Sequence, residues 1–240
     1  MKIKNRLYLQ QDLDLELFIN FSPKHSHYLA KVLRSRKSDY ISVFNDTSEY
    51  LLELIEINAK SSKGKITEKI LFHENKDFIN LYFSPIKRIA LEVMIQKCTE
   101  IGVTAFHPII MEHTQSKTFN IERLKLIAIE AIEQSDQNQI PIISEPINFT
   151  EFFLNLNEKE NIIACSLEDN LNPINQVLEK NNKKNFGILI GPEGDFSKKE
   201  VSMIKSKPQI IEASLGSNIL KSETAAIVSA CLLKELSRNA

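Results

Sequence analysis

Two glycine-marked segments in the last quarter of the chain decide the fold: Gly191-Pro192-Glu193-Gly194-Asp195 and Leu215-Gly216-Ser217-Asn218-Ile219-Leu220-Lys221-Ser222-Glu223-Thr224-Ala225. The sequence of 240 residues holds six glycines, and three of them lie in these two segments. Glycine serves where the backbone needs a positive φ or where another group must approach the main chain closely. Both segments are therefore expected to be loops with demanding backbone geometry.

Each of these loops follows a short apolar run that predicts a buried strand, at residues 186–190 and 209–211, and a helical pattern comes after each loop. Ligands of open α/β sheets bind beyond the carboxyl ends of the strands. Taken alone, the Gly-Pro-Glu-Gly run also fits an ordinary turn without a ligand. The pair of loops in this order favours a binding site.

The second part of the chain alternates strand and helix patterns. Strands are expected at 80–83, 105–110 and 161–165, and helices at 87–101, after a possible cap at Asn120, and at 222–237. This alternation predicts an α/β fold with a parallel sheet and helices on both faces.

The first part of the chain predicts a small β-barrel with one helix. Strands are expected at 41–44, 51–57 and 66–70, with a break at 63–65, and the helix at 25–36 has apolar residues at helical spacing. Polar residues 72–79 form the expected linker, so the predicted domains are 1–72 and 78–240.

Composition places the chain among globular proteins, with 42% hydrophobic residues and a formal net charge of -1. The sequence contains no uninterrupted apolar stretch of membrane-spanning length, and its beginning does not resemble a secretory signal. Cys98, Cys165 and Cys231 are scattered and match neither a disulfide framework nor a metal motif. We expect a cytoplasmic protein that uses no metal and no membrane.

Basic side chains gather in residues 24–37, which contain five lysines or arginines, two histidines and no acid. Such a patch can attract phosphate on a protein with little net charge. A solvated helix face with a basic stripe explains the same pattern. The candidate RNA contacts in this segment are Lys24, His27, Lys31, Arg34 and Arg36.

The two glycine loops together resemble those of the RsmE-type 16S ribosomal RNA uridine-N3 methyltransferases of the SPOUT superfamily, which carry a GPEGG-like and then an LGxRILRxETA-like loop. Residues 27–34, 95–103 and 133–141 are similar to further segments of that family. The resemblance implies a PUA-like RNA-binding barrel, then a SPOUT domain whose C-terminal part forms a trefoil knot. It also implies a homodimer that acts on 16S ribosomal RNA.

The same resemblance implies S-adenosyl-L-methionine as cofactor. It assigns cofactor binding to Leu167, Gly191, Glu193, Gly194, Leu215, Gly216, Ile219 and Leu220, although core packing explains the leucines equally well. It assigns catalysis to Lys221 and Glu223. Methylation of uracil N3 requires loss of a proton, and the charge of Lys221 is expected to stabilise the resulting anion.

The chain departs from the family pattern at several positions. Ser38 and Asp195 stand where the family usually has glycine, Asn218 and Lys221 where it has arginine, and His113, Gln137 and Gln139 where it has basic residues. A divergent but active enzyme is the favoured interpretation. The alternatives are a degenerate member, a SPOUT enzyme with another RNA target, and an RNA-binding assembly factor without turnover.

Overall fold

The computed structural model describes residues 5–70, 72, 78–157, 160–168, 170–180 and 186–238, so most of the expected linker lies outside the described residues. The chain divides into two compact units. The first comprises residues 1–75 and 132–139, and the second comprises residues 76–131 and 140–240. Residues 132–139, which the sequence analysis placed in the second domain, are thus grouped with the first.

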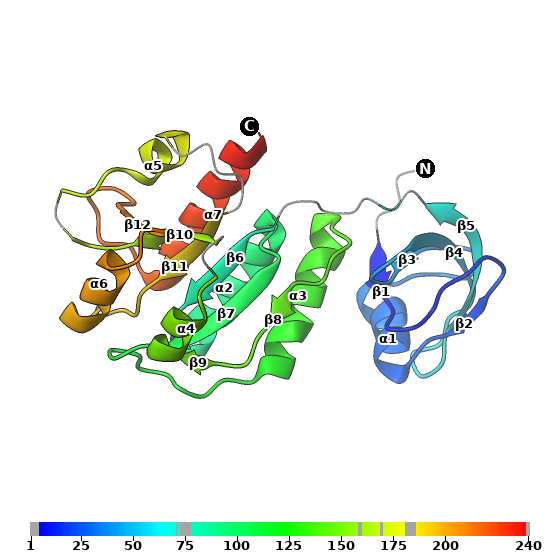
Figure 1. Ribbon diagram of the computed structural model, residues 1–240. Helices are drawn as coiled ribbons and strands as arrows, with labels where there is room; N and C mark the ends of the chain where they lie inside the picture. Colours follow the sequence, from blue (N-terminus) through cyan, green and yellow to red (C-terminus); the bar gives the residue numbers. More distant parts are fainter. Residues whose placement is uncertain are drawn as a thin grey trace. The chain divides into compact units, whose positions relative to one another are not determined.

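The second unit is built on a parallel sheet with the strand order β12-β10-β11-β6-β7-β8. Its strands are β6 (Asn80–Phe83), β7 (Ala105–Ile110), β8 (Ile142–Ile143), β10 (Asn161–Cys165), β11 (Phe186–Ile190) and β12 (Ile210–Ala213), and a short β9 (Ile147–Asn148) also pairs with β7. Every pairing within this sheet is parallel, as the alternating pattern predicted. Figure 1 shows the six strands in this order across the sheet.

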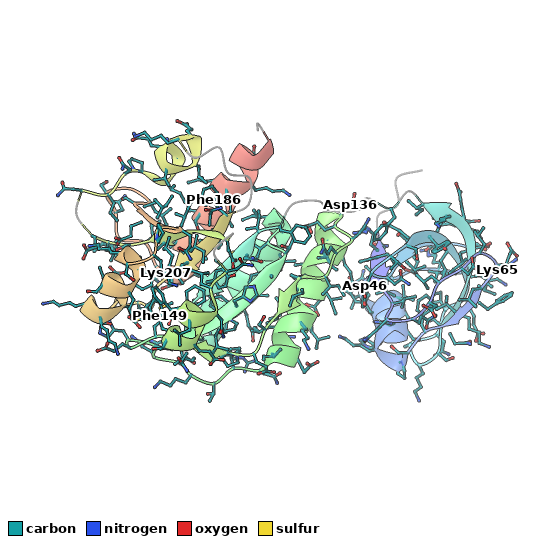
Figure 2. The ribbon with its side chains drawn as sticks, viewed as in Figure 1. Asp46, Lys65, Asp136, Phe149, Phe186 and Lys207 are labelled. Atoms are coloured by element: carbon teal, nitrogen blue, oxygen red, sulfur yellow. The ribbon has the colours of Figure 1, made fainter. Side chains whose placement is uncertain are left out.

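Both faces of the sheet are buried. Successive side chains of a strand point to opposite sides, so one strand can contribute to the apolar clusters on both faces. On β6, Leu81 and Phe83 belong to one apolar cluster and Tyr82 belongs to the other. Phe186, on β11, and Phe149, which lies outside the sheet, are labelled in Figure 2, and they belong to different clusters. A strand buried on both faces reads as a continuous apolar run, which is why the sequence revealed these strands.

The helices divide between the two faces. One cluster includes residues of α2 (Arg88–Ile101), α3 (Ile121–Ser135), α5 (Ile174–Lys180) and α7 (Ser222–Arg238), and the other includes residues of α4 (Phe149–Asn155) and α6 (Lys198–Lys205). Helices on both faces were predicted, and α6 corresponds to the helical pattern expected after the first glycine loop, but α4 and α5 were not predicted. The trefoil knot stays a prediction.

Helix ends in this unit follow local sequence signals. Gly102 ends α2 with a left-handed φ of 112°, and the side chain of Asn120 accepts a hydrogen bond from the Arg123 backbone N–H (3.0 Å), as expected for a cap. Ser197 and Glu200 form a reciprocal capping box at the start of α6. That box marks the start of the helical pattern expected after the first glycine loop.

The first unit contains a five-stranded sheet in the order β1-β3-β4-β5-β2. The strands are β1 (Arg6–Tyr8), β2 (Phe18–Asn20), β3 (Tyr40–Phe44), β4 (Glu49–Glu56) and β5 (Lys63–Ile70). β1 pairs with β3 in parallel, and the other pairs are antiparallel. Figure 1 shows these strands, coloured blue to cyan, curving around their shared core.

The expected break at residues 63–65 is wrong, because these residues begin β5. Gly64 lies in the strand, and a Cβ there would overlap the Leu52 side chain and lie 3.0 Å from the Glu53 carbonyl oxygen. A glycine inside a strand often marks such a close approach. The absence of a side chain at Gly64, and not a turn, explains the signal.

The single helix expected at residues 25–36 is also wrong in its extent. The α-helix α1 covers Pro23–His27, and a π-helical turn, η1, covers Tyr28–Val32. Arg34 has a positive φ of 53°, which ends the helical path before Arg36. Val32 was expected on the inner face but is 59% exposed, whereas Leu29 is fully buried.

Buried Arg6 links residues 132–139 to the rest of the first unit. Its guanidinium forms a two-point contact with Glu49 at 3.0 and 3.1 Å. It also donates hydrogen bonds to the carbonyl oxygens of Ile132 (3.0 Å) and Gln137 (2.9 Å) and to the side chain of Asn138. A buried arginine requires such partners for its several N–H groups.

Candidate functional site

A pocket of about 830 Å³ lies at the carboxyl ends of β10, β11 and β12, in the second unit. Its walls come from the loops that follow these strands, at residues 166–168, 170–171, 191–193, 195 and 214–221, together with the beginnings of α2 and α7. Pockets of this volume suit small molecules of cofactor size. The location agrees with the expectation that ligands bind beyond the carboxyl ends of parallel strands.

Most of the candidate residues lie together in this pocket. Those that line it are Leu167, Gly191, Glu193, Leu215, Gly216, Ile219, Leu220, Lys221 and Glu223. Gly194 is not among the lining residues. A Cβ added to Gly194 would lie 3.5 Å from the Cβ of His113, which is an ordinary contact.

The three loop glycines therefore differ in their roles. Gly216 has a φ of +118°, which residues with a side chain rarely adopt, and a Cβ there would point into open space. A Cβ on Gly191 would lie 3.3 Å from the Phe196 ring, so a close approach explains that glycine. Neither reason applies to Gly194, and its place in the loop does not require glycine.

Several lining residues were not predicted. They include Lys87, Ala90, Ser166, Glu168, Asn170, Leu171, Asp195, Ser214, Ser222 and Ala225. Lys87 is the N-cap residue of α2, the helix after the neighbouring strand β6. For the lining residues that follow β10, the sequence signal was their place after a predicted strand.

Asp195 joins parts of the site that are far apart in the sequence. It has a positive φ of 58°, and its backbone N–H closes a turn to the Pro192 carbonyl oxygen (2.9 Å). Its carboxylate Oδ2 accepts a hydrogen bond from the Leu167 backbone N–H (3.2 Å). Its carbonyl oxygen accepts one from His113 Nδ1 (3.0 Å).

The N-terminal end of helix α7 is hydrogen-bonded to the first glycine loop. The buried Ser222 hydroxyl donates a hydrogen bond to the Gly191 carbonyl oxygen (3.3 Å). Ser222 thus holds the second loop against the first. This contact explains why two glycine loops separated along the chain form one pocket wall.

The charged residues lining the pocket are Lys87 and Lys221 with Glu168, Glu193, Asp195 and Glu223. Glu168 pairs with Lys205 at 2.7 Å, and Glu212 lies 3.9 Å from the same ammonium group. Burial raises the pKa of the Glu212 carboxyl. The four carboxylates that line the pocket, on Glu168, Glu193, Asp195 and Glu223, make it suitable for a ligand that carries positive charge.

Cys165, at the end of β10, also lines the pocket. Burial raises the pKa of its thiol to about 12, so the thiol is protonated at neutral pH. A protonated thiol is a poor nucleophile. The pocket is therefore suited to positioning a reactive ligand and not to covalent catalysis through this cysteine.

The candidate RNA contacts lie in the first unit. Lys24, His27, Lys31, Arg34 and Arg36 are all exposed, along α1, η1 and the segment that follows. A basic segment of this kind, with its charges facing solvent, is accessible to phosphate groups.

Family comparison identifies both parts of the chain. A model for the RNA methyltransferase domain matches residues 73–234, and a model for the RNA methyltransferase PUA domain matches residues 23–67. The chain is 32% identical over 225 residues to the ribosomal RNA small subunit methyltransferase E of Rickettsia conorii, covering 93% of this chain and 92% of that protein. The chain belongs to the ribosomal RNA small subunit methyltransferase E family. It is also 32% identical over 241 residues to the corresponding protein of Buchnera aphidicola, covering 96% and 93%.

Solved structures have the same fold as this family member. The small subunit methyltransferase E of Neisseria gonorrhoeae, bound to S-adenosyl methionine, aligns with a TM-score of 0.86 over 97% of both chains at 22% identity. A putative methyltransferase of Legionella pneumophila in complex with the same cofactor aligns with a TM-score of 0.84 over 98% of both chains at 24% identity. The expected α/β domain with a parallel sheet, following a PUA module in the sequence, is confirmed.

Two further kinds of site were sought in the part of the chain that the structure describes. It contains no group of three or more His, Cys, Asp or Glu residues arranged to hold a metal ion. None of its helices is both long and apolar enough to cross a membrane.

The contact between His113 and the pocket loop predicts an unusual titration. Nδ1 donates to the Asp195 carbonyl oxygen, which raises the pKa of His113 above 6.5, whereas burial lowers the pKa of His25 and of His107. A raised pKa means that charged His113 stabilises the fold below pH 6.5 and that this contribution is lost as the pH rises through the folded-state pKa. In an NMR titration His113 should deprotonate at higher pH than His25 and His107. The variant His113→Gln assigns the signal, and a His113 pKa at or below 6.5 contradicts the contact.

Proposed function

We propose that this protein transfers a methyl group from S-adenosyl-L-methionine to N3 of a uridine in 16S ribosomal RNA. The observation that carries the proposal is the pocket at the ends of β10, β11 and β12, with Lys221 in its wall, in a chain of the small subunit methyltransferase E family. Relatives with the same fold contain S-adenosyl methionine. The alternative is an RNA-binding assembly factor that has the same fold but does not methylate RNA, so no methylated product is expected from it.

The pocket fits this cofactor in size and chemistry. Its volume of about 830 Å³ lies in the range for ligands of this size, and Gly216 leaves open a space that a side chain would enter. Carboxylates in the wall are compatible with the positive sulfonium and amino groups. Leu167, Leu215 and Leu220 offer apolar surface for the adenine ring. When bound, the cofactor supplies an electrophilic methyl group, so the protein has to hold and orient the reactants.

Lys221 and Glu223 are proposed to act on the target base. The methyl group leaves sulfur and bonds to N3 of uracil, and the N3 proton must be accepted by a base. Glu223, in the first turn of α7, lines the pocket and can accept this proton. The ammonium group of Lys221 can stabilise the negative charge that develops on the uracil oxygens.

The basic segment of the first unit is proposed to bind ribosomal RNA through its phosphates. Its five candidate residues are exposed and carry four fixed positive charges on Lys24, Lys31, Arg34 and Arg36. Positive charge at this density gives affinity for any nucleic acid, and the pocket selects the base. Because ribosomal RNA is its proposed substrate, we place the protein in the cytoplasm.

A homodimer is proposed from apolar surface on α2 and α7. The two helices pack together, and Ile89 and Val93 of α2 are 82% and 40% exposed. On α7, Ala226, Ala230 and Leu233 are buried, but Val228 and Leu232 remain partly exposed. Apolar surface of this kind suggests a partner.

The methylation reaction tests the proposed function directly. The purified protein should form 3-methyluridine, detected by nucleoside mass spectrometry, in 16S ribosomal RNA or small subunits that lack this modification. Lys221→Met should lower the single-turnover rate by about 10²–10³ while leaving S-adenosylhomocysteine affinity nearly unchanged. Lys221→Arg keeps the charge and should retain activity. Restoration of the Lys221→Met rate at saturating RNA would limit Lys221 to RNA binding, and the absence of any product would favour the assembly factor.

The basic segment is tested by the salt dependence of RNA binding. Replacing both Arg34 and Arg36 with alanine should lower the slope of log affinity against log salt by about one to two, because fewer counterions are released. The control Lys180→Ala, in an exposed position of α5, should leave the slope unchanged. An unaltered slope in the double variant would identify the segment as a solvated surface.

The oligomeric state is tested by light scattering. A dimer should give about 55 kDa, which is twice the 27.5 kDa of the chain. Ile89→Asp should shift the protein to the monomer, because a charge in an apolar interface is costly. Leu154→Asp, at a position on α4 that is 76% exposed, is the matched control and should stay dimeric. A monomer at micromolar concentration of the unaltered protein contradicts the proposal.

A further inference from the structure

Asp195 occupies a backbone conformation that favours a residue without a side chain. Its φ is 58°, and its N–H closes a tight turn with Pro192. Positive φ is disfavoured for residues with a Cβ, although Asp and Asn tolerate it better than most. Glycine at this position would relieve the backbone, so the presence of aspartate calls for a reason in its side chain.

The carboxylate of Asp195 supplies that reason. Oδ2 accepts the hydrogen bond from the Leu167 backbone N–H at 3.2 Å, across 28 residues of sequence. Oδ1 lies 3.5 Å from the position that a Cβ on Gly191 would take. The carboxylate therefore fills the space between the loop after β10 and the loop after β11. A charged acceptor makes this hydrogen bond stronger than one between neutral groups.

The loop that carries Asp195 is itself held from its outer side. His113 Nδ1 donates to the Asp195 carbonyl oxygen at 3.0 Å. The adjacent Glu112 backbone N–H donates to Glu200 Oε1 at 2.9 Å, and Glu200 also forms the capping box of α6 with Ser197. Asp195 is thus a fixed point of attachment.

The loop after β10 is attached on two sides, and its Glu168 also pairs with Lys205 at 2.7 Å. Ser166 is bonded to the edge strand β12 through its N–H and the Ala213 carbonyl oxygen (3.2 Å). The next residue, Leu167, is 53% exposed, and its N–H is bonded to Asp195. Without the carboxylate, this N–H would bond to water, and the loop would lose this hydrogen bond to the opposite wall.

We propose that Asp195 is a positioning residue that joins two walls of the cofactor pocket through the Leu167 backbone. The inference rests on the proposed function, since it takes the pocket as the cofactor site. Both Asp195 and Leu167 line the pocket, so their hydrogen bond sets the separation of its walls before the cofactor arrives. A preorganised site binds more tightly because less motion is lost on binding.

Two substitutions at Asp195 separate the effect of its carboxylate from the effect of its positive φ. Asp195→Gly relieves the positive φ but removes the acceptor, so it should weaken S-adenosylhomocysteine binding about tenfold while the melting temperature stays equal or rises. It should raise the KM for S-adenosylmethionine with little change in kcat. Asp195→Asn keeps an acceptor oxygen and tolerates positive φ, so its affinity should lie within about threefold of the unaltered protein.

Ser38→Gly is the matched control, because Ser38 also has a positive φ, of 68°, and belongs to the first unit. It should leave S-adenosylhomocysteine affinity unchanged. Normal affinity of Asp195→Gly overturns the proposal, and so does equal weakening by Asp195→Gly and Asp195→Asn.

Amide hydrogen exchange tests the connection without any cofactor. The Leu167 amide should exchange faster in Asp195→Gly than in the unaltered protein, and Asp195→Asn should largely retain its protection. Unchanged exchange at Leu167 in Asp195→Gly also overturns the proposal. If the unaltered protein binds no S-adenosylhomocysteine, the proposed cofactor function fails, whereas the exchange rates still decide whether Asp195 holds Leu167.

Discussion

The parallel pairing of β10 with both β11 and β12 is the constraint on which the site depends. Cys165, the last residue of β10, is in register with Ile190 on one side and with Ala213 on the other. The three strands therefore end at the same level, and the loops that follow them begin side by side. Parallel strands need long connections over the sheet faces, and the helices that provide them bury both faces. The parallel strand pairing therefore determines both the packing of the core and the geometry of the pocket.

Most of the residues that line the pocket lie in loops, and two of them, Gly216 and Asp195, have unusual φ values that shape these loops. Gly216 and Asp195 both adopt positive φ, yet only the first has the residue type that makes this easy. At Asp195 a hydrogen bond across the pocket accompanies the unfavourable backbone. Residues held in such conformations often cluster at functional sites. The departure from the family's glycine is therefore compatible with an intact pocket.

Sequence patterns predicted what depends on local or repeating signals. Buried strands such as Phe186–Ile190 appear as continuous apolar runs, and Gly102 and Asn120 mark helix ends. The helix at 25–36 was overextended because apolar spacing does not show that Arg34 turns to positive φ. The contact of Asp195 with Leu167 could not be predicted, because strand order decides which distant loops become neighbours.

The pocket collects residues from Lys87 to Ala225, and its final wall follows the last strand of the sheet. During synthesis, a chain that has emerged only as far as α6 has two of the three loops but lacks the helix whose Ser222 holds Gly191. Contacts between distant segments also slow folding, because chain entropy is lost before they form. The complete pocket thus cannot form until translation has passed the start of α7, so a shorter nascent chain has no complete pocket and no pocket-dependent activity.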